Sequence, residues 1–173
     1  MAILDILEVP DRRLTTKCAP VEQIDDDLLR LFDDMLETMY QAPGIGLAAP
    51  QVGVLKRAFV ADLGNEGERA PIYVINPEIT WRSETANVAE EGCLSLPKQF
   101  GEVSRFDQIR MRHLDRSGAM QEIVADGLLA RCLQHEIDHV NGILFVDHLS
   151  PLKRAMILRK LAKAKRTRSR ESG

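Results

Sequence analysis

Long apolar runs and an export signal are both missing from this 173-residue sequence. No uninterrupted stretch approaches the roughly 18 apolar residues that a membrane-spanning helix needs. The N-terminus, MAILDILEVPDRRL, carries acids where a signal peptide carries bases, and it lacks a small-residue cleavage site. We therefore expect no membrane segment and a cytoplasmic location.

Cysteine is scarce, since the chain has only Cys18, Cys93 and Cys132. Three cysteines cannot form a disulfide framework, and the odd number argues against secretion. In a reducing compartment each thiol is free to fill the core, to act as a nucleophile or to bind a metal. Composition does not choose among these roles.

Internal repeats, low-complexity blocks and long linkers are absent too. Apolar residues make up 45% of the chain and charged residues 28%, which is ordinary for a globular protein. A chain of this length buries a sizeable core without disulfide bonds. These features predict a single domain over residues 1–173.

Positive charge is concentrated at the C-terminal end of a chain whose net charge is −3. Residues 151–173 hold nine bases and one acid, Glu171, which leaves 14 of the 23 bases and 25 of the 26 acids for the remainder. An acidic body with a basic tail predicts an anionic partner for the tail, such as RNA. The alternative is a solvated, frayed terminus.

Three helices are expected. Apolar residues recur at helical spacing in residues 25–40, acids begin the segment, and Pro43-Gly44 ends it. Residues 127–141 are apolar on much of their surface, so this second helix should be buried. A basic amphipathic helix starts after Pro151.

Segments 57–62, 72–79 and 103–114 are rich in β-branched and alternating apolar residues and are predicted strands. Gly64-Asn65 and Asn76-Pro77 punctuate them. A helix, several strands and then two helices indicate an α+β fold rather than alternating βαβ units. We expect antiparallel or mixed β-sheets around the central buried helix.

The segment His135-Glu136-Ile137-Asp138-His139 carries the strongest signal in the chain. On a helix, positions i and i+4 lie on one face about 6 Å apart, so both imidazoles can reach one metal ion. Glu136 projects to one side, where it can exchange a proton with a water on that metal. The alternative is two surface histidines, but an apolar helix would bury these groups at a cost that a cation offsets.

A third ligand is needed, and the residues after His139 do not supply an obvious one. The longer motif HExxHxxGxxH is matched through Gly142, but Phe145 stands where its third histidine would be. Glu171 is the only glutamate after Glu136, so a later helix has no other glutamate to offer. His148 remains a candidate.

The cysteines differ as candidates for that ligand. Cys132 lies seven residues before His139, about 10.5 Å along a helix axis, so we expect it in the core. Cys18 has no neighbour that favours metal binding. Cys93 lies in segment 91–97, a plausible ordered loop or edge strand that can deliver a thiolate from outside the helix. Elimination favours Cys93, with a core cysteine as the alternative.

The segment Gly44-x-Gly46-x-x-Ala49 imitates a dinucleotide-binding fingerprint, which needs a strand before it and a helix after it. Here a helix precedes the segment and Pro50 follows it at once. We therefore expect no nucleotide cofactor. The glycines instead permit close backbone approach around a pocket.

Three segments resemble the motifs of the peptide deformylase family in content, order and approximate separation. They are GIGLAAPQVG at 44–53, EGCLS at 91–95 and QHEIDH at 134–139. Asn76-Pro77 and the closing segment SPLK at 150–153 are also similar to that family, so the resemblance covers nearly the whole chain. Each motif is moderately specific, and the three together are highly specific.

The resemblance implies a mononuclear metal site with Cys93, His135 and His139 as ligands and water in the fourth position. It implies Fe²⁺ as the native ion, commonly replaced by Zn²⁺, Ni²⁺ or Co²⁺, and a thiolate with two imidazoles suits several transition metals. The implied reaction removes the N-formyl group from the formylmethionine of nascent polypeptides and releases formate.

The resemblance also implies roles for individual residues. Metal-bound water attacks the formyl carbon, while Glu136 accepts its proton and later protonates the departing amine. The Gln51 side chain and the Leu94 backbone N–H stabilise the oxyanion together with the metal. The residues expected to line the substrate site are Gly44, Ile45, Gly46 and Leu94. Many relatives have arginine where Phe100 stands, so a substrate contact by a cation is not expected there.

The basic tail fits a contact with ribosomal RNA, beside which nascent chains emerge. Two other functions stay open from the residues alone. One is a zinc endopeptidase, which the HEIDH segment by itself suggests, and the other is a non-catalytic, metal-dependent binding module.

Overall fold

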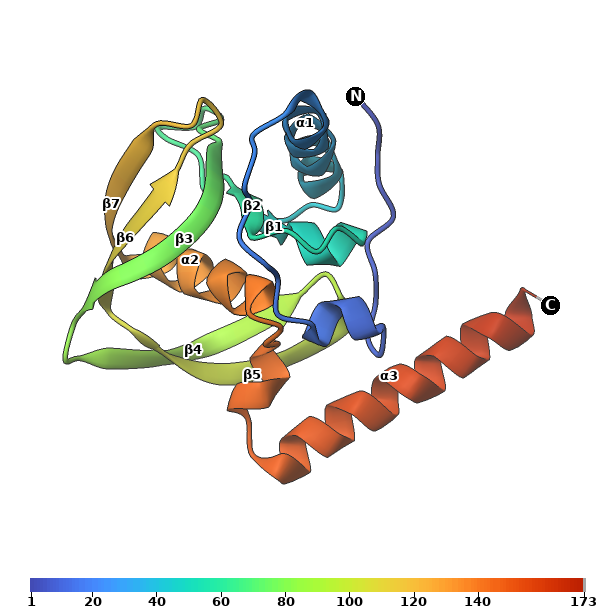
Figure 1. The fold of residues 1–173 in the computed structure, drawn as a ribbon. Helices are drawn as coiled ribbons and strands as arrows, with labels where there is room; N and C mark the ends of the chain where they lie inside the picture. The colour runs from blue at the N-terminus through green and yellow to red at the C-terminus, as the bar shows by residue number, and fades with distance from the viewer. Residues whose placement is uncertain (173) are drawn as a thin grey trace.

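The computed structural model describes residues 1–172, which form three α-helices and two β-sheets. Figure 1 shows their arrangement. The helices are α1 (Asp26–Gln41), α2 (Gly127–Val140) and α3 (Pro151–Glu171), with the short 3₁₀-helices η1 (Arg12–Thr15), η2 (Ala49–Val52) and η3 (Phe145–His148). The strands are β1 (Gly46–Ala48), β2 (Ala58–Ala61), β3 (Ile72–Arg82), β4 (Ala86–Cys93), β5 (Leu96–Phe106), β6 (Gln108–Leu114) and β7 (Met120–Asp126). The expected α+β fold class is confirmed.

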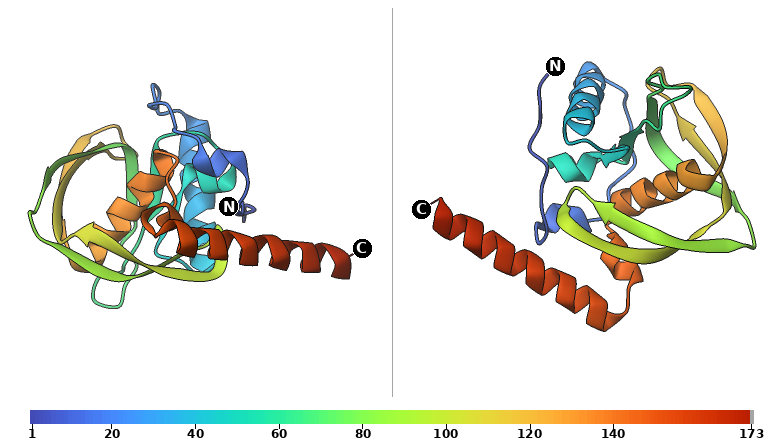
Figure 2. Two further views of the ribbon diagram at one scale, coloured as in Figure 1. Left: turned by 90° about the horizontal axis from the view of Figure 1, so that it is seen from below. Right: turned by 180° about the vertical axis from the view of Figure 1, so that it is seen from behind.

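The strands form a five-stranded sheet, in the order β1-β2-β3-β6-β7, and a separate two-stranded sheet of β4 and β5. Every pairing between these strands is antiparallel. Helix α2 lies between the two sheets (Figures 1 and 2). One face of α2 packs on the five-stranded sheet through Ala130, Leu133, Ile137 and Val140. The opposite face of α2 is therefore turned towards β4 and β5.

Helix α1 lies within one residue of the expected range at each end. Its first turn is capped by Asp25, whose carboxylate accepts a hydrogen bond of 2.9 Å from the Leu28 N–H. Phe32, Met35 and Met39 are buried with Leu28 against β1 and β2. The helical spacing of these apolar residues thus predicts both the helix and the face that it buries.

The expectation of one strand over residues 103–114 is wrong, because the chain changes sheets at Asp107. Strand β5 pairs with β4, whereas β6 pairs with β3 and β7. The side chains at 103 and 105 in β5, and at 109, 111 and 113 in β6, are all buried. Buried and exposed side chains continue to alternate across Asp107, because both sheets turn the same alternate positions inward. The sequence pattern therefore does not reveal the change of sheet.

The segment Asn76-Pro77, which punctuates the predicted strand 72–79, lies inside β3. The pairing of β3 with β6 shifts register between Ile75 and Glu78, and Asn76 has a φ of 52°. The Asn76 side chain bonds both the N–H and the C=O of Val21, at 2.8 and 2.9 Å. Asparagine tolerates this left-handed conformation, and the bulge fastens the N-terminal segment to the sheet.

The sequence pattern also fails to reveal β1, β4 and β7. Strands β4 and β7 leave most of their side chains exposed or partly exposed, so they lack a clear apolar alternation. Strand β1 is only three residues long and lies within the glycine-containing segment.

Helix α3 starts at Pro151, as expected, with Ser150 as its cap. It extends beyond the sheets and α2 in Figures 1 and 2, and only Ile157 and Leu161 are buried within its described part. These two residues pack with β5 and η3. None of the described helices combines the length and the apolarity needed to cross a membrane. A single domain over residues 1–173 stays a prediction.

Candidate metal centre

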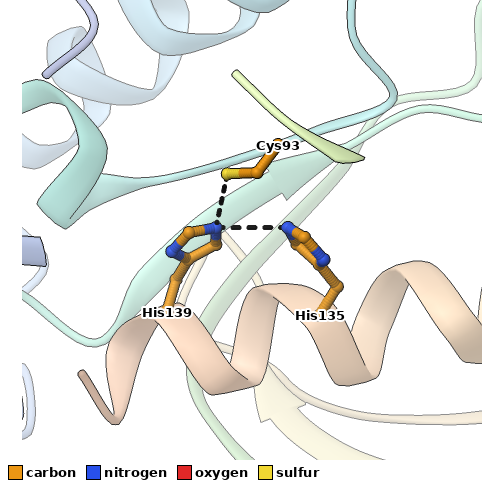
Figure 3. Close-up of side chains that lie close together, drawn as sticks. All are labelled: Cys93, His135 and His139. Atoms are coloured by element: carbon orange, nitrogen blue, oxygen red, sulfur yellow. Dashed lines mark hydrogen bonds between the residues drawn. The ribbon is translucent and has the colours of Figure 1, made fainter. Parts of the chain in front are cut away.

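Helix α2 presents His135 and His139 on the face that is turned away from the five-stranded sheet. Their rings lie one turn apart, and the two Nε2 atoms are 3.2 Å from each other (Figure 3). The Nδ1 atom of His135 bonds Glu91 Oε1 at 2.9 Å. In the tautomer that donates this ring proton to Glu91, the Nε2 lone pair of His135 is free to bind a metal.

Strand β4 brings Cys93 to the same point from the two-stranded sheet. Cys93 is the last residue of β4, and its Sγ atom is 3.3 Å from His139 Nε2 (Figure 3). The ligand atoms of Cys93, His135 and His139 all lie within 4.8 Å of one another. Among residues 1–172, these are the only histidine, cysteine or acidic side chains grouped in this way.

Two of the three separations between the donor atoms can be compared with those expected around one tetrahedral ion. Metal–nitrogen bonds of about 2.0–2.1 Å and a metal–sulfur bond of about 2.3 Å place such ligand atoms about 3.3–3.6 Å apart. The two distances drawn in Figure 3, 3.2 and 3.3 Å, lie just below and at the lower end of that range. Burial lowers the pKa of His139 well below its ordinary value, which favours the neutral ring that metal binding requires.

The other candidate ligands lie elsewhere. His148 bonds Asp138 at 2.8 Å and is not part of the group. Cys132 is buried, as expected, and its thiol contacts the Ile45 carbonyl at 3.8 Å. Cys18 is also buried, near the Thr16 carbonyl.

Sequence reasoning missed the polar network around Glu91. The Glu91 carboxylate accepts hydrogen bonds from Arg105 at 2.9 Å, from Arg131 at 2.7 Å and from His135 at 2.9 Å. Burial alone would raise the pKa of Glu91, but the hydrogen bonds from Arg105 and His135 outweigh it and lower the pKa well below its usual range. Glu91 precedes Cys93 by two residues, so alternation along a strand could have placed both on one face.

Glu136 adjoins His135 in α2 and is buried. Its side chain is 3% exposed, and its Oε1 atom has no hydrogen-bond partner within residues 1–172. Burial raises the pKa of Glu136 to about 7. A carboxyl group with such a pKa can both accept and donate a proton near neutral pH.

Gln51 in η2 is buried and has a fixed amide orientation. Its Oε1 atom accepts a hydrogen bond of 3.0 Å from the Ala48 N–H. Its Nε2 atom therefore points to Ser95 Oγ, at 3.1 Å, and to Cys93 Sγ, at 3.5 Å. The predicted donor thus lies next to the ligand residue Cys93, whereas Ser95 was not anticipated.

A cavity of about 590 Å³ opens beside these side chains. All four residues expected to line the substrate site lie in its wall, namely Gly44, Ile45, Gly46 and Leu94. Gln51, Cys93, His135 and Glu136 line it as well. Phe100 is 59% exposed and lines the same cavity.

Comparison with known proteins identifies the family. The family model described as "Polypeptide deformylase" matches residues 3–155. The peptide deformylase of Alkalilimnicola ehrlichii is 60% identical over 163 residues, which are 94% of this chain and 91% of that protein. This chain belongs to the peptide deformylase family.

Solved peptide deformylase structures share the fold. The Legionella pneumophila enzyme has a TM-score of 0.90 and 50% identity, and the match covers 98% of this chain and 99% of that one. The Ehrlichia chaffeensis enzyme, solved in complex with actinonin, has a TM-score of 0.92 and 43% identity over 96% of this chain and 99% of that one.

Family membership decides among the functions that the residues left open. The chain is an amidohydrolase of a metal-dependent family, not an endopeptidase or a non-catalytic binding module. The group formed by Cys93, His135 and His139 is a site able to hold that metal.

Proposed function

We propose that this chain removes the N-formyl group from the N-terminal formylmethionine of nascent polypeptides and releases formate. Cys93, His135 and His139 hold one divalent transition metal, and Glu136 is the general acid and base. The observation that carries the proposal is the convergence of three ligand atoms within 4.8 Å beside a buried carboxylate and a cavity. A metal bound there supplies a Lewis acid that activates water and polarises the formyl oxygen.

Fe²⁺ is the proposed native ion, and Zn²⁺, Ni²⁺ or Co²⁺ can replace it. The donor set supports this range, because one thiolate and two imidazoles suit several first-row transition metals.

Glu136 accepts a proton from the attacking water as the new C–O bond forms at the formyl carbon. When the C–N bond breaks, Glu136 returns this proton to the amine, which leaves as the free N-terminus. The raised pKa of about 7 supports both transfers, since the proton affinity of the carboxyl group then matches the working pH.

The oxyanion that develops on the formyl oxygen is stabilised by the Gln51 amide and the Leu94 backbone N–H. The Gln51 amide supports this role because the Ala48 N–H already fixes its orientation. Gly44, Ile45, Gly46 and Leu94 hold the peptide, since all four line the cavity. The methionine side chain enters an apolar part of the cavity near α2, where Leu128 and Cys132 lie.

Replacement of Glu136 tests the mechanism. Glu136→Ala should retain the metal yet lose formate release by at least about 10²–10⁴-fold, the usual contribution of general acid–base catalysis. Metal content and formate release from a formyl-methionyl peptide are measured on the same sample. Glu90→Gln, at an exposed position on the cavity wall, is the matched control and should stay active. An active Glu136→Ala enzyme would refute the assigned role.

We also propose that the basic helix α3 contacts ribosomal RNA in the cytoplasm, where formylated chains emerge. Helix α3 (Pro151–Glu171) includes nine bases, and nearly all of its side chains are exposed. Exposed bases on one extended helix provide the charge that phosphate binding requires.

A further inference from the structure

Arg131 takes no part in the proposed chemistry, although it lies next to the ligand residues. It precedes His135 by one helical turn, so Arg131, His135 and His139 form one stripe along α2. The residue is 9% exposed and lines the wall of the cavity. A buried guanidinium group is costly unless partners compensate its charge and its donors.

All partners of Arg131 come from the two-stranded sheet. Its Nη1 atom donates to Glu91 Oε2 at 2.7 Å and to the Val103 carbonyl at 2.9 Å. Its Nη2 atom donates to the Asn87 carbonyl at 3.0 Å and to Asn87 Oδ1 at 2.7 Å. One side chain of α2 therefore binds both β4 and β5.

The two-stranded sheet is held against α2 mainly by hydrogen bonds and ion pairs of side chains. It does not pair with the five-stranded sheet, and two strands alone are marginally stable. The apolar cluster around α2 contains no buried residue of β4 or β5, whereas Leu96 and Val103 of β5 pack with η3 and α3. The contact between α2 and the hairpin is therefore largely polar, made by Arg131, by Gln134 and by Arg105.

Arg131 also balances charge beneath the site. Arg105 is shared between Glu91, at 2.9 Å, and Asp138, at 2.6 Å. With Arg131 present, two guanidinium groups serve these two carboxylates. Without it, one would remain for both, and Glu91 would keep His135 in place less firmly.

We propose that Arg131 is a positioning residue of the metal centre. It fastens β4, which carries Cys93, to α2, which carries His135 and His139, and so slows the loss of the bound metal. This inference rests on the ligand set given under the proposed function. It adds a residue whose contribution is to hold two ligand-bearing elements together.

Metal release from the holoenzyme tests the inference. Protein loaded with Co²⁺ is mixed with excess chelator, and loss of the thiolate–cobalt absorption gives the release rate. Arg131→Met should release Co²⁺ about 10–100-fold faster, the usual effect of losing a group that supports a ligand. Arg131→Lys keeps the charge but not the four hydrogen bonds. Its release rate should lie between those of the parent and Arg131→Met. Arg159→Met, on exposed helix α3, should match the parent.

A general loss of stability is separated from a positioning role by a second control. Leu28→Ala lies in the cluster around α1, whose buried residues include none of β4 or β5, and lowers stability. It should leave the release rate unchanged at temperatures where it stays folded. Release from Arg131→Met within about twofold of the parent, or equal acceleration by Leu28→Ala, overturns the inference.

Asn87→Ala keeps the test decisive if Arg131→Met does not fold. Asn87 is exposed, and its replacement removes one hydrogen bond from Arg131 and one to Asp107, without leaving a buried charge unpaired. We expect release about threefold faster, and an unchanged rate contradicts the inference. Cys93→Ser tests the ligand set itself. If this variant released Co²⁺ at the rate of the parent and kept the same absorption, the metal would be bound elsewhere.

Discussion

Position 46 leaves no space for a side chain. A Cβ atom added to Gly46 would lie 2.5 Å from Glu136 Oε2 and 2.9 Å from its carboxyl carbon. Gly46→Ala should therefore displace the Glu136 carboxyl group while leaving the three ligand residues in place. We expect formate release to fall by about 100-fold or more, within the range attributed to general acid–base catalysis, with metal content unchanged.

Formate release and metal content measured together check this prediction. Gly67→Ala is the control for replacing a glycine, since no atom lies within 4 Å of the added carbon. It should lower stability somewhat, because Gly67 has a φ of 83°, and should not change formate release. Full activity of Gly46→Ala would show that Glu136 can move without consequence.

At the scale of single elements, the C-terminal end of α2 is held by Arg57. The Arg57 Nη1 atom donates to Asn141 Oδ1 at 2.8 Å and to the Val140 carbonyl at 3.2 Å. A cation at this end of a helix satisfies free carbonyl groups and opposes the helix dipole. Arg57→Met should lower the free energy of unfolding by about 1–3 kcal/mol.

Urea denaturation measures this change. The control is Lys56→Met, at a neighbouring position whose side chain makes no hydrogen bond within residues 1–172, and it should stay within about 0.5 kcal/mol of the parent. Equal stabilities of the two variants would count against the capping role of Arg57.

The segment that joins β2 to β3 is held by Asp62. Its carboxylate accepts hydrogen bonds from Tyr40 and from the backbone N–H groups of Gly64 and Ala70. Burial raises the pKa of Asp62, but these bonds outweigh it and lower the pKa below its ordinary value. A lowered pKa means that the folded state favours the ionised form.

The stabilisation by Asp62 is therefore present above the unfolded pKa of about 4 and is lost as the pH falls. Asp62→Asn should lower the free energy of unfolding by about 1–3 kcal/mol at pH 7, and the difference from the parent should shrink below about pH 4. Urea denaturation of both proteins at the two pH values checks this. A difference independent of pH would show that ionisation of Asp62 is not involved.

At the scale of the whole molecule, the first part of α3 contributes to the folded core, whereas the part beyond Leu161 is proposed to bind RNA. Its buried residues Ile157 and Leu161 belong to a core cluster, so removal of the entire helix would damage the fold. The bases beyond Leu161 are exposed, and among residues 1–172 Arg168 alone of them pairs with an acid, Glu8, at 2.9 Å. The exposed remainder is therefore the part to alter.

Charge reversal of Lys163, Arg166 and Arg170 to Glu should weaken ribosome binding at least tenfold at low salt and reduce its salt dependence. Hydrolysis of a short formyl-methionyl peptide should not change. The matched control reverses three exposed bases on other elements, Arg30, Arg82 and Arg112. Co-sedimentation with ribosomes over a range of salt concentrations measures the effect, and unchanged affinity would rule out the contact.

The sequence by itself determined the features that depend on neighbours in the chain. The spacing of His135 and His139 predicted a shared face because a helix repeats every 3.6 residues. Periodic apolar residues predicted α1 and α2 closely, and family motifs marked Cys93, Gln51 and Glu136 as site residues. The roles assigned to those residues remain predictions for the experiments above.

Only the tertiary structure decided the features that depend on how distant segments pack. The sequence pattern does not show that the chain changes sheets at Asp107, because both sheets bury the same alternate positions. The convergence of Cys93 on α2, and the hydrogen bonds of Glu91 with Arg105 and Arg131, join residues up to 46 positions apart. Such contacts follow from the relative placement of whole elements, which no local pattern encodes.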